Sequence, residues 1–591
     1  MQNQINFNKR FILGITLVSA MGGLLFGYDW VVIGGAKPFY ERFFDIASSP
    51  YLQGWAMSSA LIGCLVGAMA SGYLTDRFGR KQPLIGAAAL FTIAAIGTGA
   101  VNQFTPFILY RLVGGIGIGL DPFNFGLLFE KYLHTPDRVS NPVRGEELRT
   151  LLHGNIHTYL DFALDFAWAG LFNEAIELIS LGISEQKGQP VYPLALYCKA
   201  WFEAQNGDQK SSERTLKEAA NATPDYCFPN QTEAVVVLEW AKLQNQAGAK
   251  APYYLGNFWY NARQYDEAVS NWELSVKIDD SFPTVHRNLS LAYFNKQKEP
   301  EKALAELEKA FTLDQTDARI LMELDQLYKR MNYLPELRLQ NLEKYLDLVE
   351  DRDDLYLERA TLYNLLGQYE TAFELIMARK FHPWEGGEGK VTGQYVRSLT
   401  EMAKKGIQDQ QYEKAIEILN CAQSYPENLG EGKLIGAQEN EIFYWLGCAF
   451  HGLGNEEKAT ESWEKAASGM NEPSAAIFYN DQQPDTIFYQ GLALIKLDKK
   501  EEAKERFEKL VNFGKQHLDD VFKLDYFAVS LPDLQIWEDD LQRRNKLHCK
   551  YLLGLGYLGL GNIEKAKNFF KPILKTDINH IGCKIHLNLI D

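Results

Sequence analysis

Several kinds of chemistry are scarce or missing in this 591-residue sequence. The seven cysteines are scattered and contain no C-x-x-C pair, so neither a disulfide framework nor a zinc site is indicated, and we expect free thiols. None of the ten histidines belongs to an H-E-x-x-H motif, and no G-x-S-x-G is present. The sequence therefore predicts no catalytic centre, no metal site and no cofactor, and we do not expect an enzyme.

Charge is scarce in the first part of the chain. Residues 1–120 contain eight Lys or Arg and four Asp or Glu, which gives them a net charge of +4. Because the whole chain has a net charge of −16, the remaining residues carry −20. A nucleic-acid partner needs a basic surface, so the acidic remainder argues against one. The class of protein thus changes near Leu120, from apolar and Gly/Ala-rich to acidic and soluble in character.

Long apolar runs fill this first part. Runs at residues 11–35, 54–74 and 83–101 are each long enough for the ~20 residues that a membrane core requires. A fourth run at 104–120 is shorter and contains Arg111. The first run is too long for a signal peptide. Basic residues before the first run and after the second predict that those ends are cytoplasmic, so four spans would leave the rest of the chain in the cytoplasm.

The loop between the second and third runs resembles the signature loop of the major facilitator superfamily, through Gly72, Asp76, Arg77, Gly79, Arg80 and Lys81. Two more segments resemble sugar porters of that family: Gly22 to Asp29, and Arg111-x-x-x-Gly115-x-x-x-Gly119. The resemblance implies a multi-pass protein of the bacterial inner membrane, in contact with the lipid bilayer, with glycines at close helix crossings. It covers about residues 5–120, about a third of a porter, and only the resemblance suggests a link to sugars. Asp29 and Arg111 match positions that tune coupling or gating, and we interpret them as remnants because most of the sugar-contacting spans are missing.

After Asp121 the apolar pattern has the helical period and repeats at about 34 residues, as in tetratricopeptide (TPR) repeats. Small residues recur where paired helices would cross, with aromatic residues beside them: Gly256, Ala268, Gly447, Ala459, Gly554 and Ala566. The predicted fold class is all-α, with three or four transmembrane helices in a domain at 1–120 and a TPR-type α-solenoid at 121–591. Pairs of Glu and Asp residues are abundant on the helices and are interpreted as parts of solvated faces. We expect an unknown protein partner on the concave face.

One segment, residues 381–390, is too rich in Gly and Pro for a helix. It is interpreted either as an inter-repeat loop or as a binding loop with Trp384 as an apolar anchor and four polar contacts, His382, Glu385, Glu388 and Lys390. A second stretch, residues 525–534, also interrupts the repeats. With these two stretches and with Tyr253–Asn257 and His286–Leu289, residues 121–591 resemble the TPR half of a bacterial family of unsettled function. Members of that family carry a mutarotase-like domain that this chain lacks, and they are linked to carbohydrate metabolism.

Three functional hypotheses follow. The favoured one is a chimera, in which a truncated, non-functional porter start anchors a TPR scaffold for protein–protein interaction at the membrane. The alternatives are a component of a sugar transporter of the major facilitator superfamily, and an accessory subunit in carbohydrate metabolism.

Overall fold

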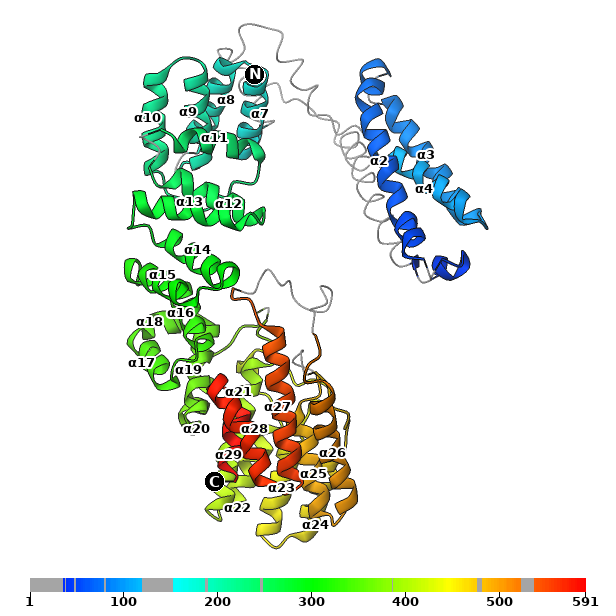
Figure 1. Ribbon diagram of the computed structural model, residues 1–591, viewed down its shortest axis with the longest axis vertical. Helices are drawn as coiled ribbons and strands as arrows, with labels where there is room; N and C mark the ends of the chain where they lie inside the picture. The colour runs from blue at the N-terminus through cyan, green and yellow to red at the C-terminus, as the bar shows by residue number, and fades with distance from the viewer. Residues whose placement is uncertain are drawn as a thin grey trace, which may run out of the picture. The chain divides into compact units, whose positions relative to one another are not determined.

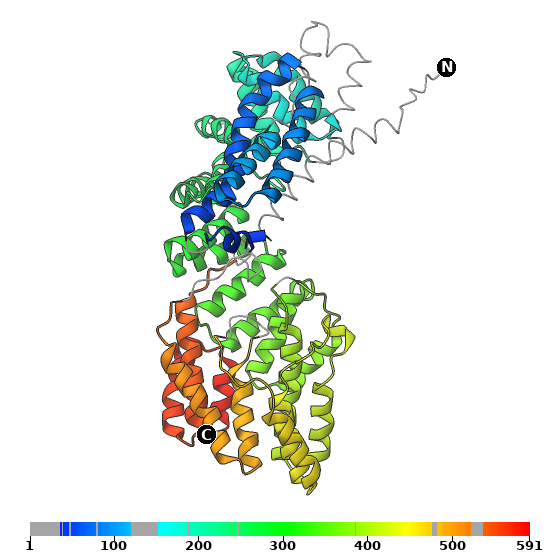
Figure 2. The same cartoon turned by 90° about the vertical axis from the view of Figure 1, so that its right-hand side faces the viewer.

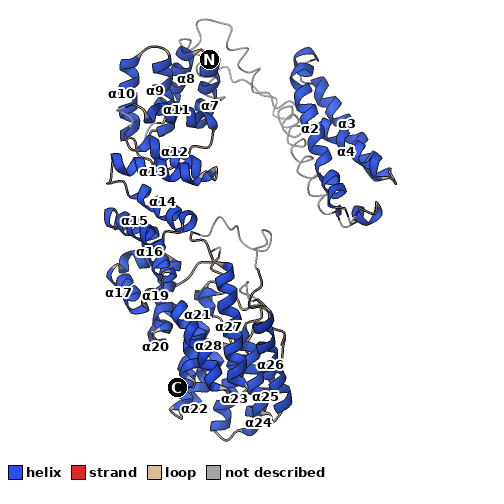
Figure 3. Cartoon of the chain, viewed as in Figure 1, coloured by secondary structure: helices blue, strands red, loops and turns tan. Residues whose placement is uncertain are grey.

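The computed structural model describes residues 36–37, 39–46, 49–78, 81–119, 152–186, 190–244, 248–384, 386–475, 481–521 and 536–590 (Figure 1). Within these ranges the regular secondary structure is helical and contains no strand, which confirms the all-α prediction (Figure 3). The chain divides into two compact units, Met1–Arg149 and Thr150–Asp591.

The first unit contains α2 (Pro50–Phe78), α3 (Lys81–Ala100) and α4 (Phe104–Gly119). Helices α2 and α4 cross at small residues, because a Cβ added to Gly115 would overlap the backbone of Ala60. The predicted span at 11–35 lies outside the described residues. Among the helices that are described, none combines the length and the apolar character that a membrane crossing requires.

The second unit is an array of helix pairs. Its helices are α7 (Ile156–Trp168), α8 (Phe172–Glu185), α9 (Pro193–Gln205), α10 (Gln209–Asn221), α11 (Thr232–Lys242), α12 (Lys250–Asn261), α13 (Tyr265–Ile278), α14 (Pro283–Ala292) with the π-turn η1 (Tyr293–Gln297), α15 (Pro300–Leu313), α16 (Ala318–Arg330), α17 (Pro335–Lys344), α18 (Leu346–Glu350), α19 (Asp353–Leu365), α20 (Tyr369–Ala378), α21 (Lys390–Gln408), α22 (Tyr412–Ala422), the 3-10 turn η2 (Glu427–Leu429), α23 (Asn440–Gly452), α24 (Glu456–Ala467), α25 (Pro484–Lys496), α26 (Lys500–Gln516), α27 (Leu541–Gly559), α28 (Ile563–Thr576) and α29 (Ile581–Asn588).

The core of the array follows the predicted repeat pattern. Ala268, Ala459 and Ala566 are fully buried at the crossings of successive helices. A Cβ added to Gly554 would overlap the ring of Phe570, and the same relation joins the corresponding pairs Gly256–Trp272 and Gly447–Trp463. Small residues therefore let the paired helices approach, and aromatic side chains fill the space beside them. This arrangement confirms the TPR-type interpretation of the second unit.

The C-terminal helices return to the middle of the array. Asn579, just before α29, donates to the carbonyl of Lys329 at the end of α16, at a distance of 3.5 Å. It also accepts from Arg338 Nη1 of α17 at 3.0 Å, and Ile578 N donates to Asn332 Oδ1 at 2.7 Å. These contacts span more than 240 residues of sequence, and they close α16–α29 into a ring. Figure 2 shows the C-terminal helices beside the green helices from the middle of the chain. The first helices of successive pairs, α19, α21, α23, α25 and α27, pack side by side, and we call them the inner helices of the ring.

Candidate functional site

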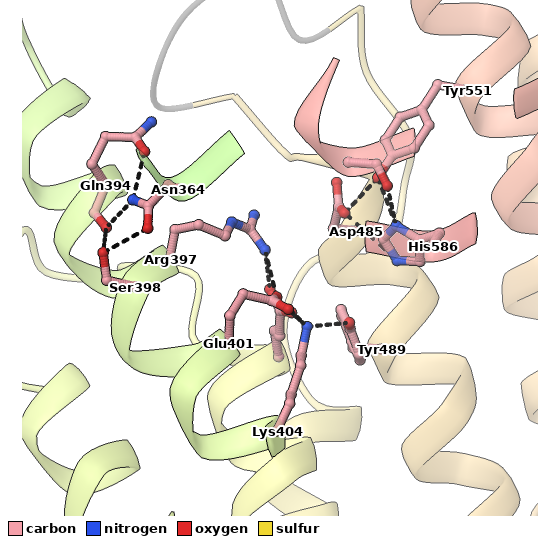
Figure 4. A network of polar contacts seen from close by, with 12 residues as sticks. Asn364, Gln394, Arg397, Ser398, Glu401, Lys404, Asp485, Tyr489, Tyr551 and His586 are labelled. Atoms are coloured by element: carbon pink, nitrogen blue, oxygen red, sulfur yellow. Dashed lines mark hydrogen bonds and ion pairs between the residues drawn. The ribbon is translucent and has the colours of Figure 1, made fainter. Parts of the chain in front are cut away.

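The inner helices of the ring place an ion-pair network on its interior (Figure 4). Arg397, Glu401 and Lys404 are spaced i, i+4 and i+7 on α21, so their side chains share one face of that helix. Glu441 in the first turn of α23 and Tyr489 on α25 complete the group. We call these five residues the inner network.

Lys404 is the centre of the inner network. Its Nζ lies 2.6 Å from an Oε1 of both Glu401 and Glu441, and it donates to the hydroxyl of Tyr489 at 3.4 Å. Arg397 Nη1 lies 3.4 Å from Glu441 Oε2 and 3.6 Å from Glu401 Oε1. Two cations thus bind the same two carboxylates, which holds α21, α23 and α25 in one arrangement.

The charges of the inner network stabilise one another. Burial opposes ionisation of Glu441, but the charges of Lys404 and Arg397 outweigh it and lower the pKa of this carboxyl to about 2. The pKa of Arg397 is raised, because the charges of Glu441 and Glu401 outweigh its burial, and burial raises the pKa of Tyr489 well above its ordinary value. Near neutral pH Glu441 and Arg397 are therefore ionised and the Tyr489 phenol is neutral, so none of these three side chains is tuned to exchange a proton.

A second cluster adjoins the first. Tyr551 of α27 donates to Asp485 Oδ1 of α25 at 2.6 Å, and its hydroxyl lies 3.2 Å from His586 Nδ1 of α29. His586 Nδ1 also lies 2.8 Å from the carbonyl of Gly582, which can only accept, so we assign the proton to Nδ1. Burial lowers the pKa of His586, so the ring is neutral. Its Nε2 is 3.8 Å from Asp485 Oδ1 and has no hydrogen-bond partner in the described part of the chain.

Together the two clusters carry a net charge of −1, from three carboxylates (Glu401, Glu441, Asp485) and two cations (Arg397, Lys404). Several of these side chains keep contact with solvent: Arg397 is 21% exposed, Glu441 18% and Asp485 22%. The arrangement can bind a charged or hydrogen-bonding group of a partner. Sequence reasoning missed this arrangement, because the Glu and Asp residues of the helices are interpreted there as parts of solvated faces. The signal that could have found it is the i, i+4, i+7 spacing of charge on an inner helix.

The predicted binding loop is held by neighbouring segments. The backbone N of His382 donates to Asp353 Oδ2 at 2.8 Å, and its exposed ring contacts the same oxygen. Trp384 covers Gly387, and Glu431 accepts from the backbone N of Gly389 at 3.0 Å. Glu388 is exposed, and Glu385 lies outside the described residues. Lys390 begins α21, and its pKa is lowered by burial and by the charge of Lys329.

The residues that resemble a porter are placed only in part. Arg77 is exposed in the last turn of α2, and Arg111 is buried within the first unit on α4. Gly72, Asp76, Lys81 and Gly119 lie on the described helices α2, α3 and α4, whereas Asp29, Gly79 and Arg80 lie outside the described residues. Among the described residues, no group of His, Cys, Asp and Glu has the arrangement of a metal site.

Two family models match the chain. One is the sugar (and other) transporter family, over residues 15–122, and the other is the tetratricopeptide repeat, over residues 485–512 in α25 and α26. The arabinose-proton symporter of Bacillus subtilis is 42% identical over 110 residues, 19% of this chain and 23% of that protein. The D-xylose-proton symporter of Escherichia coli is 37% identical over 138 residues, 19% of this chain and 28% of that protein. The chain thus spans about a quarter of the length of these curated relatives.

Solved structures similar to the chain include other repeat proteins. One is a tetratricopeptide repeat protein from Parabacteroides merdae, at 15% identity and a TM-score of 0.24, covering 51% of this chain and 98% of that one. Another is the TPR protein YrrB, at 15% identity and a TM-score of 0.23, covering 39% of this chain and 90% of that one. The N-terminal part of the chain is therefore similar to sugar transporters, and its C-terminal part is similar to TPR proteins.

Proposed function

We propose that this chain is a membrane-anchored scaffold for protein–protein interaction, in which a truncated, non-transporting sugar-porter start is fused to a TPR array. The observation that carries the scaffold function is the inner network, where partly exposed, ionised side chains line the ring. Fixed charges of this kind suit recognition of a partner, and they do not suit acid–base catalysis.

Membrane anchoring is supported by the surface of the first unit. Leu65 and Met69 on α2 are 62% and 72% exposed, and Ile96 on α3 is 68% exposed. A soluble protein rarely leaves so many large apolar side chains on adjacent helices, whereas lipid would cover them. We propose that α2–α4 and residues 11–35 enter the bilayer together as one packed group. The signature-loop cations then lie in the cytoplasm, as does the array.

Loss of transport is proposed from the share of a porter that is present. Porters bind substrate between two six-helix halves, and the region similar to them covers about a quarter of such a protein. Sugar uptake by cells expressing the intact chain is expected to equal that of an empty-vector control. Uptake above the control would favour the transporter-component hypothesis instead.

The scaffold proposal is tested by crosslinking in cells that express the full chain. Arg397→Glu reverses a charge of the inner network, and Lys465→Glu reverses a half-exposed charge on the outer helix α24. We expect a defined set of crosslinked proteins that is lost with Arg397→Glu and kept with Lys465→Glu. Thermal unfolding of each variant checks that the array is intact. Identical crosslinks in the wild type and both variants would contradict binding at the inner network.

A further inference from the structure

A short segment of the chain lies on the array as a bound peptide would. Residues Ile536–Asp540 precede α27, are not helical, and contact η1 and α16, which lie more than 200 residues earlier in the sequence (the orange segment in Figure 1). We call these five residues the docked segment. Its receptor is the surface at the carboxyl ends of α14–η1 and α16.

Side chains of the receptor bind the backbone of the docked segment. Asn295 donates from Nδ2 to the carbonyl of Ile536 at 2.8 Å and accepts at Oδ1 from the backbone N of Glu538, also at 2.8 Å. Arg330 donates to the carbonyls of Trp537 and Glu538, at 3.0 and 3.2 Å. The buried amide of Asn295 thus pairs with both a carbonyl and an N–H of this non-helical segment, whose backbone groups have no partner in a helix or sheet.

The receptor also contacts the side chains of the docked segment, and Trp537 is the most deeply buried of them. The Trp537 indole is 1% exposed, donates to the carbonyl of Glu323 at 3.2 Å, and meets the Phe294 ring edge-on with centroids 5.2 Å apart. It is the apolar anchor of the contact.

The carboxylates that follow Trp537 meet cations. Lys296 and Lys298 bind the two carboxylate oxygens of Glu538, the latter at 3.0 Å, and Arg330 lies 3.5 Å from Asp539. Burial disfavours ionised Glu538, but these lysines outweigh it and lower its pKa. Three cations therefore gather at one place in an acidic array, opposite an aromatic–acidic sequence.

We propose that this receptor is a peptide-binding site for extended segments in which an aromatic residue is followed by acidic residues, and that the docked segment occupies it in cis. Asn295 and Arg330 bind the peptide backbone, and the Phe294 ring packs against the indole. Lys296, Lys298 and Arg330 bind the carboxylates. The proposal rests on the proposed scaffold function and specifies one class of partner for it. A partner peptide competes with the docked segment, whose tether gives it a high effective concentration.

Binding of a synthetic peptide to the purified full chain tests this site. The probe is a fluorescein-labelled peptide with the sequence of residues 533–542, followed by fluorescence anisotropy. In the variant Glu538→Lys the docked segment is repelled by Lys296 and Lys298 while the receptor stays intact. We expect this variant to bind the probe at least about tenfold more tightly than the wild type, because the cis competitor is gone. Adding Asn295→Ala and Lys296→Ala to the same variant abolishes the gain.

Matched controls separate recognition from a purely structural role. A probe with Trp replaced by Ala, and a second with both acidic residues after Trp replaced by Lys, are expected to lose binding to the Glu538→Lys chain. Trp537→Ala offers an independent way to release the segment if Glu538→Lys fails to fold. Equal binding of all probes, or no binding to either released and folded chain, overturns the proposal. These outcomes are independent of crosslinks at the inner network, so either proposal can fail alone.

Discussion

The two units of this protein handle apolar surface in opposite ways. In the first unit, α2 and α4 approach through Gly115 and Ala60, and large side chains such as Leu65 and Met69 face outward. In the array, glycines such as Gly554 make room for a neighbouring aromatic ring, and the large side chains lie between helices. The same helix period thus serves two environments. Packing through small residues suits a helix whose outer surface is covered by lipid, and aromatic filling suits one whose outer surface is wet.

The largest expected effect comes from separating the units. Residues 150–591 expressed alone should remain soluble after high-speed centrifugation, with a mostly helical far-UV circular dichroism spectrum. The full chain should sediment with membranes and resist carbonate extraction, because the proposed anchor places the exposed apolar side chains of α2 and α3 in lipid. A full chain that stays soluble without detergent would contradict the proposal that the first unit lies in lipid.

Polar burial in the array provides the next test. Arg338 and Asp325 are each 1% exposed and form a bidentate pair at 2.6 and 3.0 Å. Arg338→Leu should destabilise the array by about 3–5 kcal/mol, because Asp325 would keep a buried charge without its partner. Thermal or urea unfolding measures the loss. The double variant Asp325→Leu/Arg338→Leu should recover most of the stability, and a double variant as unstable as the single one would count against this explanation.

Two glycines in the array allow one substitution to be compared in two environments. Gly554→Ala should destabilise by about 1–3 kcal/mol, because the added Cβ overlaps the Phe570 ring. Gly393→Ala on α21 should stabilise by about 0.5–1 kcal/mol, because its Cβ meets open space and alanine favours the helix. Urea unfolding midpoints compare the two variants. A Gly554→Ala midpoint equal to or above that of the wild type would show that packing does not require a glycine at this crossing.

A pH dependence of stability tests the buried polar groups of the array in another way. The inner network lowers the pKa of Glu441 to about 2, below the unfolded value of about 4.3, so its contribution is complete above that value and is lost as the pH falls. Stability of residues 150–591 should fall by about 1.5–2 kcal/mol between pH 6 and pH 3 on account of this group. Glu441→Gln should flatten the profile by that amount. An unchanged profile in the variant would place the acid sensitivity in other carboxyls.

Much of the array could be predicted from short sequence patterns. The spacing of Ala268, Ala459 and Ala566 relative to aromatic residues identified the helix pairs, because the contacts that these residues make are with the next helix along the chain. The predicted loop at 381–390 was also placed between helices. The interior of the ring was not predictable in this way. A hydrogen bond joins Tyr551 to Asp485, which are 66 residues apart in the sequence. The residue pattern within one helix pair does not predict a contact between residues that lie so far apart along the chain.

The sequence by itself determined the helical class, the repeat period and the similarity of the N-terminal part to sugar transporters, because each depends on residues close together along the chain. Only the tertiary structure decided that the array closes on itself, that Arg397 and Lys404 of α21 bind Glu441 of α23, and that Trp537 lies against α16. Closure depends on small rotations between successive helix pairs that accumulate over many repeats. No single repeat determines the sum of these rotations, so the contacts between distant repeats can be seen only when the whole array is in place.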